Sequence, residues 1–473
     1  MKNQKTIPDV NGAAAKLNQR PSITSGLVFA LICFVPIFAS VVFGAVSTGT
    51  LALLTIVVGL LLIFWTIDIW FAKKVRLNTS LILVPIICLI FIGLLQLLPL
   101  RGIAYSPELL TVQSSRSLSL DANATWLAMG KLFIFLLFFT AALTYVNSPQ
   151  RLRKVVFTII VFSAVMSFIG ILQYLGSPNL IFGLREVDYA TPFASYVNRH
   201  HFAAFMEMTI GLTLGLLFGK ATENDKRLLL VIAVVLMGIA VIMTSSRGGF
   251  LSLIGVLGFL VFLNLYFRDT SAETDAVSET GGLRENLVLI GGSVGLVLVL
   301  LVVAIWLGGT DEVARGAAFQ VNQEDFSSGR LHFWSVALQI FKDYPILGSG
   351  LESFGVAFTQ YDSWNGALRV EQAHNDYLQT LSDSGIVGFI CVVSFIFLLF
   401  KRGLNVVRNS TNRFRKNVAI GALAGCFGIL LHSFVDFPLR TNANMLFFLL
   451  LAALATVNIN YPKVYRKPVP VRN

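Results

Sequence analysis

His374 and Asn375 stand directly before an apolar run that is long enough to enter a membrane. A neutral imidazole at a membrane surface can accept a proton from a hydroxyl group at physiological pH. A histidine in this position can also simply cap the helix that follows. The pattern therefore predicts a general base at His374, weighed against a structural cap.

Three arginines stand against the ends of apolar runs: Arg199, Arg247 and Arg440. A charge next to hydrocarbon is energetically costly, so its presence there suggests a function. Arg247 lies in the turn Ser245–Gly249, whose two glycines are expected to let the backbone turn sharply and leave the arginine projecting. Arginine presents a fixed fork of donors that suits phosphate. Together with Arg330, the set predicts an anion-binding site, whereas the alternative for Arg247 is a snorkelling or topogenic charge.

The elements that must position these groups belong to a strongly apolar chain. Of its 473 residues, 55% are hydrophobic and 13% are charged, whereas a soluble domain carries about 25% charged residues. Runs near 20 residues recur along the whole length, and about 20 suffice to cross a bilayer as a helix. We expect an all-α integral membrane protein with about twelve transmembrane helices. The predicted spans are 25–46, 50–72, 79–98, 124–146, 155–176, 200–219, 228–245, 249–267, 287–308, 385–400, 417–433 and 443–460.

The basic residues predict the orientation. With the N-terminus in the cytoplasm, inner segments hold 25 of the 36 lysines and arginines, outer segments hold ten, and Lys131 lies within a span. Cytoplasmic loops are rich in these residues, which supports this topology and accounts for most of the net charge of +11 without a nucleic-acid partner. His374 and the four arginines named above all fall on the outer side, and nine of the ten outer basic residues are arginine.

One membrane unit is expected rather than a string of soluble domains. Lys131 and Glu207 lie within spans and are expected to pair with other buried groups or to line a cavity. In the longest outer loop, Leu331–Asp343 repeats apolar residues at helical spacing, which predicts an amphipathic helix on the outer membrane surface. Its expected apolar stripe is Trp334, Ala337 or Leu338, and Phe341. The expected divisions are 1–24 (cytoplasmic tail), 25–460 (membrane domain, with a large periplasmic loop at 309–384) and 461–473 (cytoplasmic tail).

Neither a metal nor a cofactor is expected. His200 and His201 are adjacent and would point in different directions on a helix. Glu186 and Asp188 have the spacing of acidic pairs that hold a divalent ion in some sugar transferases, but one such pair in a loop is a weak signal. All four cysteines lie in apolar runs, which indicates neither a disulfide framework nor a zinc site.

Five stretches together resemble the superfamily of bacterial O-antigen ligases and related polysaccharide polymerases. In one of them, His374 and Asn375 are followed by nine residues, Gly385, two residues and Gly388, which is similar to the ligase pattern H-[NSQ]-x9-G-x-x-[GTY]. The resemblance covers about 200–440. The other four stretches are Asn198–Phe205, Ser245–Gly249, Gly329–Trp334 with Tyr344–Gly350, and His432–Pro438.

The resemblance implies a glycosyltransferase of the GT-C class in the bacterial cytoplasmic (inner) membrane, surrounded by membrane lipids, with its active site facing the periplasm. Such enzymes transfer a glycan from undecaprenyl pyrophosphate to an acceptor hydroxyl. The acceptor is a sugar of the lipid A core in ligases and another lipid-linked repeat in polymerases. The His-Asn pattern slightly favours a ligase, and a polymerase stays open.

For the site, the resemblance implies an inverting, metal-independent reaction with His374 as the base. Arg247 and Arg330, with Arg199 as a third, would hold the pyrophosphate. Either Asp436 or Asn375 would orient His374, and the sequence leaves that choice open. Further substrate-site candidates are Asn375, Asp436 and Arg440.

Two other functions suit twelve spans: a transporter or flippase of lipid-linked sugars, and a non-catalytic scaffold for envelope assembly. Secondary transporters usually show related halves and charged sites near the midplane. The sequence shows no repeat between its halves, and its unusual charges gather on one side. A scaffold would leave the Arg247 turn and the His374 motif without a role, so glycan transfer is the first hypothesis.

Overall fold

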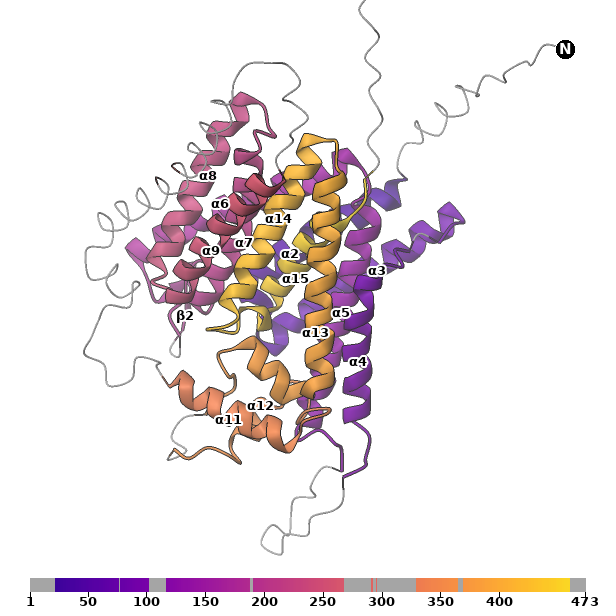
Figure 1. Cartoon of the computed structure of the whole chain (residues 1–473), viewed down its shortest axis with the longest axis vertical. Coiled ribbons are helices and arrows are strands. Elements are labelled where there is room, and N and C mark those ends of the chain that lie inside the picture. The colour runs from indigo at the N-terminus through magenta and orange to yellow at the C-terminus, as the bar shows by residue number, and fades with distance from the viewer. Residues whose placement is uncertain are drawn as a thin grey trace, which may run out of the picture.

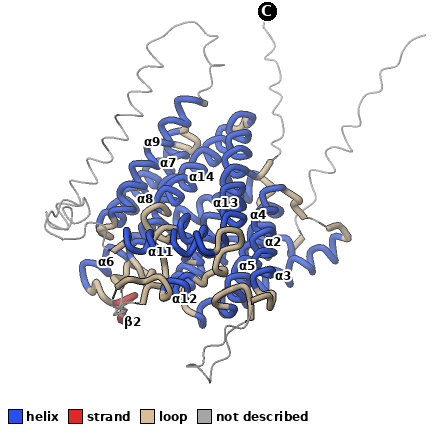
Figure 2. The backbone as a smooth tube through the Cα atoms, turned by 60° about the horizontal axis from the view of Figure 1, so that its bottom comes forward, coloured by secondary structure: helices blue, strands red, loops and turns tan. Residues whose placement is uncertain are grey.

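The computed structural model describes residues 22–459, apart from 76, 102–115, 188–189, 365–368 and all but two glycines of 268–328. Within these residues the regular structure is helical except for one antiparallel hairpin, β1 (Leu180–Ile181) and β2 (Arg185–Glu186), which lies at the edge of the molecule (Figure 2). Nine of the described helices are long and apolar enough to cross a membrane. The chain is therefore a helical, multi-pass membrane protein, as its hydropathy predicts.

These nine helices coincide with nine of the predicted spans. They are α2 (Ile23–Val41), α3 (Thr48–Ala72), α5 (Ala122–Tyr145), α6 (Pro149–Gly176), α7 (Arg199–Phe218), α8 (Asn224–Met243), α9 (Arg247–Tyr266), α13 (Asp376–Asn409) and α14 (Arg413–His432).

Two shorter apolar helices occupy two more predicted spans: α4 (Val84–Gln96), which follows the 3-10 turn η2 (Leu81–Leu83), and α15 (Asn442–Thr456). The predicted span 287–308 lies outside the described residues, apart from its two glycines. The described residues also exclude the C-terminal tail, residues 309–328 of the long loop, and Asp188. Of the N-terminal tail, only 22–24 are described.

Helices α7 and α14 form the centre of the bundle. The most apolar stretch of α7 is 89% buried and that of α14 is 83% buried, against 22% for α3. Glycines bring the two backbones almost into contact, because a Cβ added to Gly211 would lie 2.6 Å from the backbone nitrogen of Gly425. Small residues allow this close approach of membrane helices. The close packing of α7 and α14 therefore fixes the residues at the ends of these two helices relative to each other.

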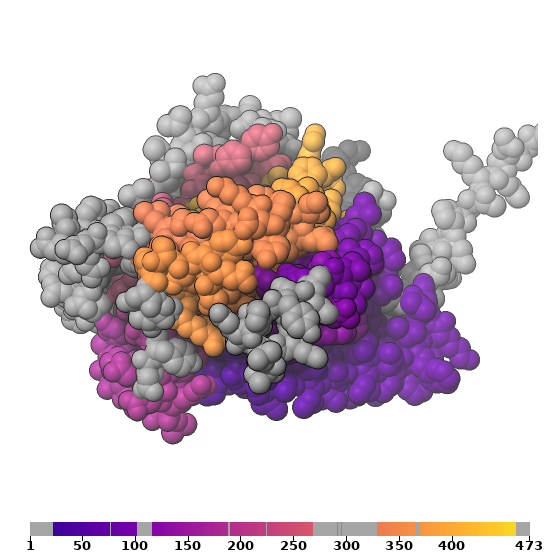
Figure 3. All heavy atoms as spheres, turned by 90° about the horizontal axis from the view of Figure 1, so that it is seen from below, coloured from indigo at the N-terminus to yellow at the C-terminus, as the bar shows by residue number. Residues whose placement is uncertain are grey.

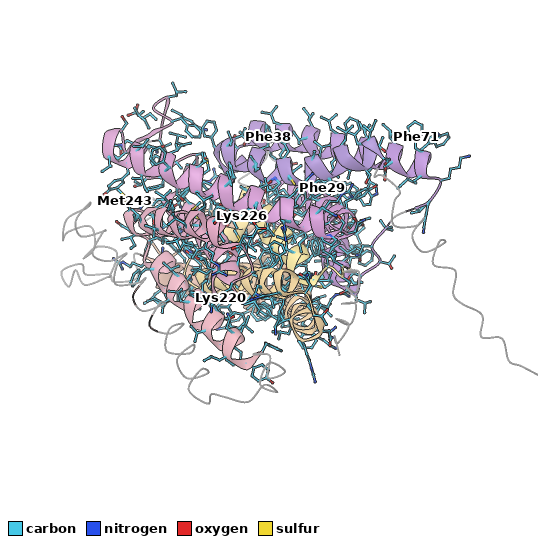
Figure 4. All side chains as sticks on the ribbon, turned by 90° about the horizontal axis from the view of Figure 1, so that it is seen from above. Phe29, Phe38, Phe71, Lys220, Lys226 and Met243 are labelled. Atoms are coloured by element: carbon cyan, nitrogen blue, oxygen red, sulfur yellow. The ribbon has the colours of Figure 1, made fainter. Side chains whose placement is uncertain are left out.

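The two ends of the bundle differ. Beyond one end lie two short helices, α11 (Arg330–Asp343) and α12 (Phe354–Phe358), at the bottom of Figure 1. Seen from below, the segment that contains them covers the middle of that end (Figure 3). The view from above, Figure 4, shows Lys220 after the end of α7, Lys226 in the first turn of α8, and Phe38 and Phe71 along the edge formed by α2 and α3. We call the end that carries α11 and α12 the outer end.

The amphipathic helix predicted at 331–343 is present as α11, but its register differs from the expectation. Leu338 is 43% exposed, and Trp334 is only partly buried. The helix packs on α12 and α13, so its apolar stripe is set by a protein surface and not by lipid. The residues that α11 buries are Phe333, Val336, Ala337 and Ile340.

Helix α13 begins ahead of the predicted span 385–400 and is kinked at Gly385. Gly385 has φ 61° and ψ −167°, a conformation that is essentially open to glycine alone. The segment Tyr344–Gly350 lies against the kink, where Ile386 N donates to Pro345 O at 2.8 Å and Ser349 N donates to Ser382 O at 2.8 Å. These hydrogen bonds therefore fix the segment Tyr344–Gly350 against the kink in α13, the helix that follows His374.

Candidate active site

His374 and Asp436 are joined by a hydrogen bond at the outer end. His374 lies one residue before the N-cap of α13 with a positive φ of 51°, and its Nδ1 is 3.0 Å from Asp436 Oδ1. The His374 side chain is 32% exposed, whereas the Asp436 side chain is 3% exposed. The imidazole is thus reachable from outside while its partner is enclosed.

The charge state of Asp436 determines which imidazole nitrogen is available. Burial alone would raise the pKa of Asp436, but the hydrogen bond from His374 and the nearby histidines hold it well below its usual range. An ionised carboxylate can only accept a hydrogen bond, so His374 Nδ1 carries the proton and Nε2 holds a free lone pair. This arrangement suits a general base, because Nε2 can take a proton while Asp436 stabilises the resulting imidazolium.

Asn375 is the residue that caps α13. Its Oδ1 accepts hydrogen bonds from the backbone nitrogens of Tyr377 and Leu378, each at 3.0 Å, which satisfies two of the free donors in the first turn. Its Nδ2 donates to Phe434 O at 2.9 Å. The capping role that the sequence also allowed for His374 therefore belongs to Asn375, which ties α13 to the turn that carries Asp436.

Aromatic rings enclose the His374 imidazole. Phe437 stands edge-on to it with ring centroids 4.7 Å apart, and Phe437 makes the same kind of contact with His201 at 4.8 Å. Phe333 of α11 lies 5.9 Å from the His374 ring. The imidazole is held between the turn after α14 and the helix that covers the outer end.

Four of the five histidines of the chain interact electrostatically with Asp436: His200, His201, His374 and His432. His200 Nδ1 is 2.9 Å from Ser246 Oγ, and His201 Nδ1 is 2.7 Å from Thr441 Oγ1, so the adjacent pair does point in different directions. In the part of the chain that the structure describes, no group of three or more metal-ligating side chains is found.

A second acid–histidine pair lies behind the first. Glu207 of α7 and His432 of α14 are fully buried, with His432 Nδ1 3.0 Å from Glu207 Oε1. The sequence predicted a buried partner or a cavity for Glu207, and the partner is His432. This pair packs directly against the first turn of α9.

The glycines beside Arg247 serve close packing and not a sharp turn, which corrects the expectation. The residue with positive φ in that turn is Ser245, at 51°, while Gly248 and Gly249 lie in the first turn of α9. A Cβ on Gly248 would lie 2.6 Å from His432 Nε2. Helix α9 can therefore start against the buried histidine only if this position has no side chain.

Arg199, Arg247 and Arg330 share one structural position, since each is the first residue of a helix. Arg247 is exposed, and the other two are partly buried. Arg199 and Arg330 both interact electrostatically with His200. Helix N-termini carry partial positive charge and free N–H groups, so three such ends near the histidine cluster favour an anion.

Arg440 is placed differently from the other arginines. Its Nη1 is 3.1 Å from Asp383 Oδ2, and its Nε is 3.6 Å from Asp376 Oδ1, with both carboxylates buried. A cavity of about 170 Å³ lies beside it, lined also by Lys131 and Glu352, whose charged groups are 2.6 Å apart. Arg440 therefore ties α13 to the turn after α14. Lys131 lines a cavity, as the sequence allowed, and its partner Glu352 is only partly buried.

Several residues of this region were not singled out from the sequence. Asp376 and Asp383 gave no usable signal, because they precede a predicted span in what reads as an ordinary polar loop. Ser246 and Phe437 are of common types, and only their contacts with His200, His201 and His374 reveal them.

Comparison with known proteins gives one match. Residues 232–393 match the model of the O-antigen ligase family, which confirms the resemblance predicted from the motifs. The matched segment contains Arg247, Arg330 and His374 and ends before Asp436. No curated protein matches the chain.

Proposed function

We propose, from the match of residues 232–393 to the O-antigen ligase family, that this chain is a glycosyltransferase using undecaprenyl-pyrophosphate-linked glycan as donor. It transfers the glycan to an acceptor hydroxyl at the outer end of the bundle. In a bacterial cell that end faces the periplasm, and the chain resides in the cytoplasmic membrane. The favoured acceptor is a sugar of the lipid A core, which makes the chain an O-antigen ligase.

The observation that carries this proposal is the His374–Asp436 hydrogen bond at the outer end. The acceptor oxygen attacks the anomeric carbon of the donor and loses its proton to His374 Nε2. The bond from that carbon to the pyrophosphate oxygen breaks, and undecaprenyl pyrophosphate leaves with the electron pair. Attack opposite the leaving group inverts the anomeric configuration. A base of this kind contributes about 10²–10⁴-fold in rate.

The arginines supply the second part of the mechanism. Negative charge grows on the pyrophosphate as the glycosidic bond breaks, and preorganised donors stabilise that charge by about 3 kcal/mol each. Arg247 and Arg330, with Arg199, are assigned to this task because each stands at a helix N-terminus near the histidine cluster. The charge of the chain's own groups suffices for this step, and no metal ion takes part in it.

The distribution of buried charge supports transfer over transport. Asp376, Asp383 and His432 lie at or near the outer ends of α13 and α14, and Asp436 lies in the turn after α14. Glu207 pairs with His432. A transporter that binds its substrate at the membrane centre would concentrate such groups near the middle of the bundle.

The test is a transfer assay with purified protein in detergent and a defined undecaprenyl-pyrophosphate glycan. One arm supplies lipid A core as acceptor, and the other supplies a second lipid-linked repeat. Product on lipid A supports the ligase. A ladder on the lipid carrier would replace it with the alternative, a polymerase. No product in either arm from folded protein that binds the donor would overturn transfer and favour translocation, which a liposome assay would then measure.

A further inference from the structure

A stacked pair of rings lies at the outer end of the bundle, near the start of α11. The indole of Trp364 stacks on the imidazole of His332 with centroids 4.2 Å apart and planes 12° from parallel. Asp362 holds both residues, because its Oδ1 is 2.8 Å from His332 Nε2 and accepts the backbone N–H of Trp364 at 3.0 Å. One carboxylate oxygen therefore fixes the imidazole and the chain that carries the indole.

In this stacked pair the indole of Trp364 is exposed, whereas the imidazole of His332 is largely covered. Trp364 is 43% exposed, while the side chains of His332 and Asp362 are 15% and 10% exposed. The hydrogen bonds from His332 and from the backbone N–H of Trp364 lower the pKa of Asp362, so the carboxylate that holds the pair is ionised. A large aromatic face is thus rigidly presented to the outside, although burying it would be favourable.

The stacked pair lies one ring away from the His374 site. Phe333 lies 5.8 Å from Trp364 on one side and 5.9 Å from His374 on the other, so a single ring separates the indole from the imidazole. Gly329, with φ of 81°, passes so close that a Cβ there would lie 3.1 Å from both Phe333 and Trp364. The next residue is Arg330, which is assigned to the pyrophosphate.

We propose that Trp364, backed by His332, is a carbohydrate-binding subsite on which a pyranose ring of the glycan chain stacks while the reacting sugar lies at His374. The apolar C–H face of a pyranose matches the face of an indole, and the fixed imidazole behind it removes the entropic cost of ordering the tryptophan. The inference rests on the proposed transfer reaction and specifies its substrate, which is a chain of several sugars.

Binding is tested first, without the reaction. The free oligosaccharide of the donor, without its lipid, is titrated against the full-length protein in detergent and followed by ligand-observed NMR. Trp364→Ala is expected to weaken binding about tenfold, the upper range for an aromatic pair, and Trp364→Phe to restore part of it. Equal affinity of Trp364→Ala and wild type, or no saturable binding to wild type, would overturn the subsite.

Two exposed tryptophans are matched controls. Trp126 of α5 is 61% exposed at the outer end, and Trp70 of α3 is 81% exposed at the opposite end. Replacing either by alanine removes an exposed indole without touching the stacked pair, so oligosaccharide binding should not change. If Trp126→Ala weakened binding as much as Trp364→Ala, the effect would come from membrane anchoring at the interface, and the subsite would be wrong.

Kinetics then show which substrate supplies the stacked sugar. Trp364→Ala is expected to raise KM about tenfold for the long-chain substrate and to leave kcat unchanged, because the indole does not contact the reacting atoms. A single-sugar version of the same substrate should show no change. Varying the length of donor and acceptor in turn identifies the source of the sugar. An equal loss with short and long substrates would contradict the subsite, whereas an inactive wild type that still binds oligosaccharide would refute only the transfer reaction.

Discussion

At the scale of single residues, the hydrogen bond between His374 Nδ1 and Asp436 Oδ1 decides which imidazole nitrogen faces the substrate. The two residues are 62 positions apart, so no local pattern could pair them. The position of His374 before a membrane-entering helix allowed either a base or a cap, and the resemblance to the ligase pattern favoured the base. What could not be predicted was the choice between Asp436 and Asn375, which depends on how α13 meets the turn after α14.

Replacing Asp436 by asparagine tests this pairing. An amide is neutral and can donate to Nδ1, which removes the stabilised imidazolium and favours the wrong tautomer. We expect kcat to fall on the order of 10²–10⁴-fold while donor binding changes little. Asp343→Asn is the matched control, since Asp343 is exposed and accepts a hydrogen bond from Tyr361 away from the site. Normal kcat in Asp436→Asn would show that the carboxylate does not act through His374.

The low pKa of Asp436 also predicts how stability depends on pH. A carboxyl group whose pKa is lowered by folding stabilises the fold fully above its unfolded pKa, about 3.9, and loses that contribution as the pH falls toward its folded value. The difference in Tm between wild type and Asp436→Asn should therefore shrink as the pH falls below about 4. A difference that keeps growing below about pH 4 would contradict the ionised state.

At the scale of elements, the site depends on where helices begin. Arg199, Arg247 and Arg330 each start a helix, and Asn375 caps a fourth. The starts of α7, α9 and α11 follow from local signals such as apolar runs, and the sequence placed them closely, whereas α13 begins at Asp376, well ahead of the predicted start at 385. The register of α11 was wrong by contrast, because the face it buries is determined by α12 and α13 and not by its own periodicity.

Gly248→Ala tests the packing of α9 against the buried pair. The added Cβ would meet His432 Nε2 at 2.6 Å, and a ring held by Glu207 cannot easily move away. The overpacking costs about 1–3 kcal/mol and displaces the turn that carries Arg247. We expect transfer to fall at least tenfold with membrane insertion retained.

Gly258→Ala is the control for that experiment. It lies in the same helix, and nothing stands within 4 Å of its added Cβ. Activity and Tm should match wild type. If both alanine variants were equally active, the glycine at 248 would not be required for the position of α9.

At the scale of the whole molecule, the orientation of the bundle is a consequence of its charges. The side richer in lysine and arginine is expected to face the cytoplasm, which sends α11, α12 and the His374 site to the other side. Hydropathy could predict most spans because each is a local property of about 20 residues. It could not predict that α7 and α14 form the buried centre, because that depends on glycines facing each other across 214 positions, as Gly211 and Gly425 do.

Cysteine labelling tests this orientation. Ser335 on α11 and Thr411 between α13 and α14 are exposed at opposite ends of the bundle. With a membrane-impermeant maleimide on intact spheroplasts, Ser335→Cys should be labelled at once and Thr411→Cys only after permeabilisation. The four native cysteines lie in apolar helices, and the unsubstituted protein gives the background. The reverse pattern would place the His374 site in the cytoplasm.

The most direct test of the central claim is single-turnover glycan transfer by His374→Ala beside wild type. Both proteins are loaded with the lipid-linked donor to saturation, and their fold is checked by Tm and by donor binding. If His374 is the base, donor binding stays within about twofold of wild type while the rate of transfer falls on the order of 10²–10⁴-fold. Transfer at the wild-type rate by folded, donor-bound His374→Ala would contradict the mechanism.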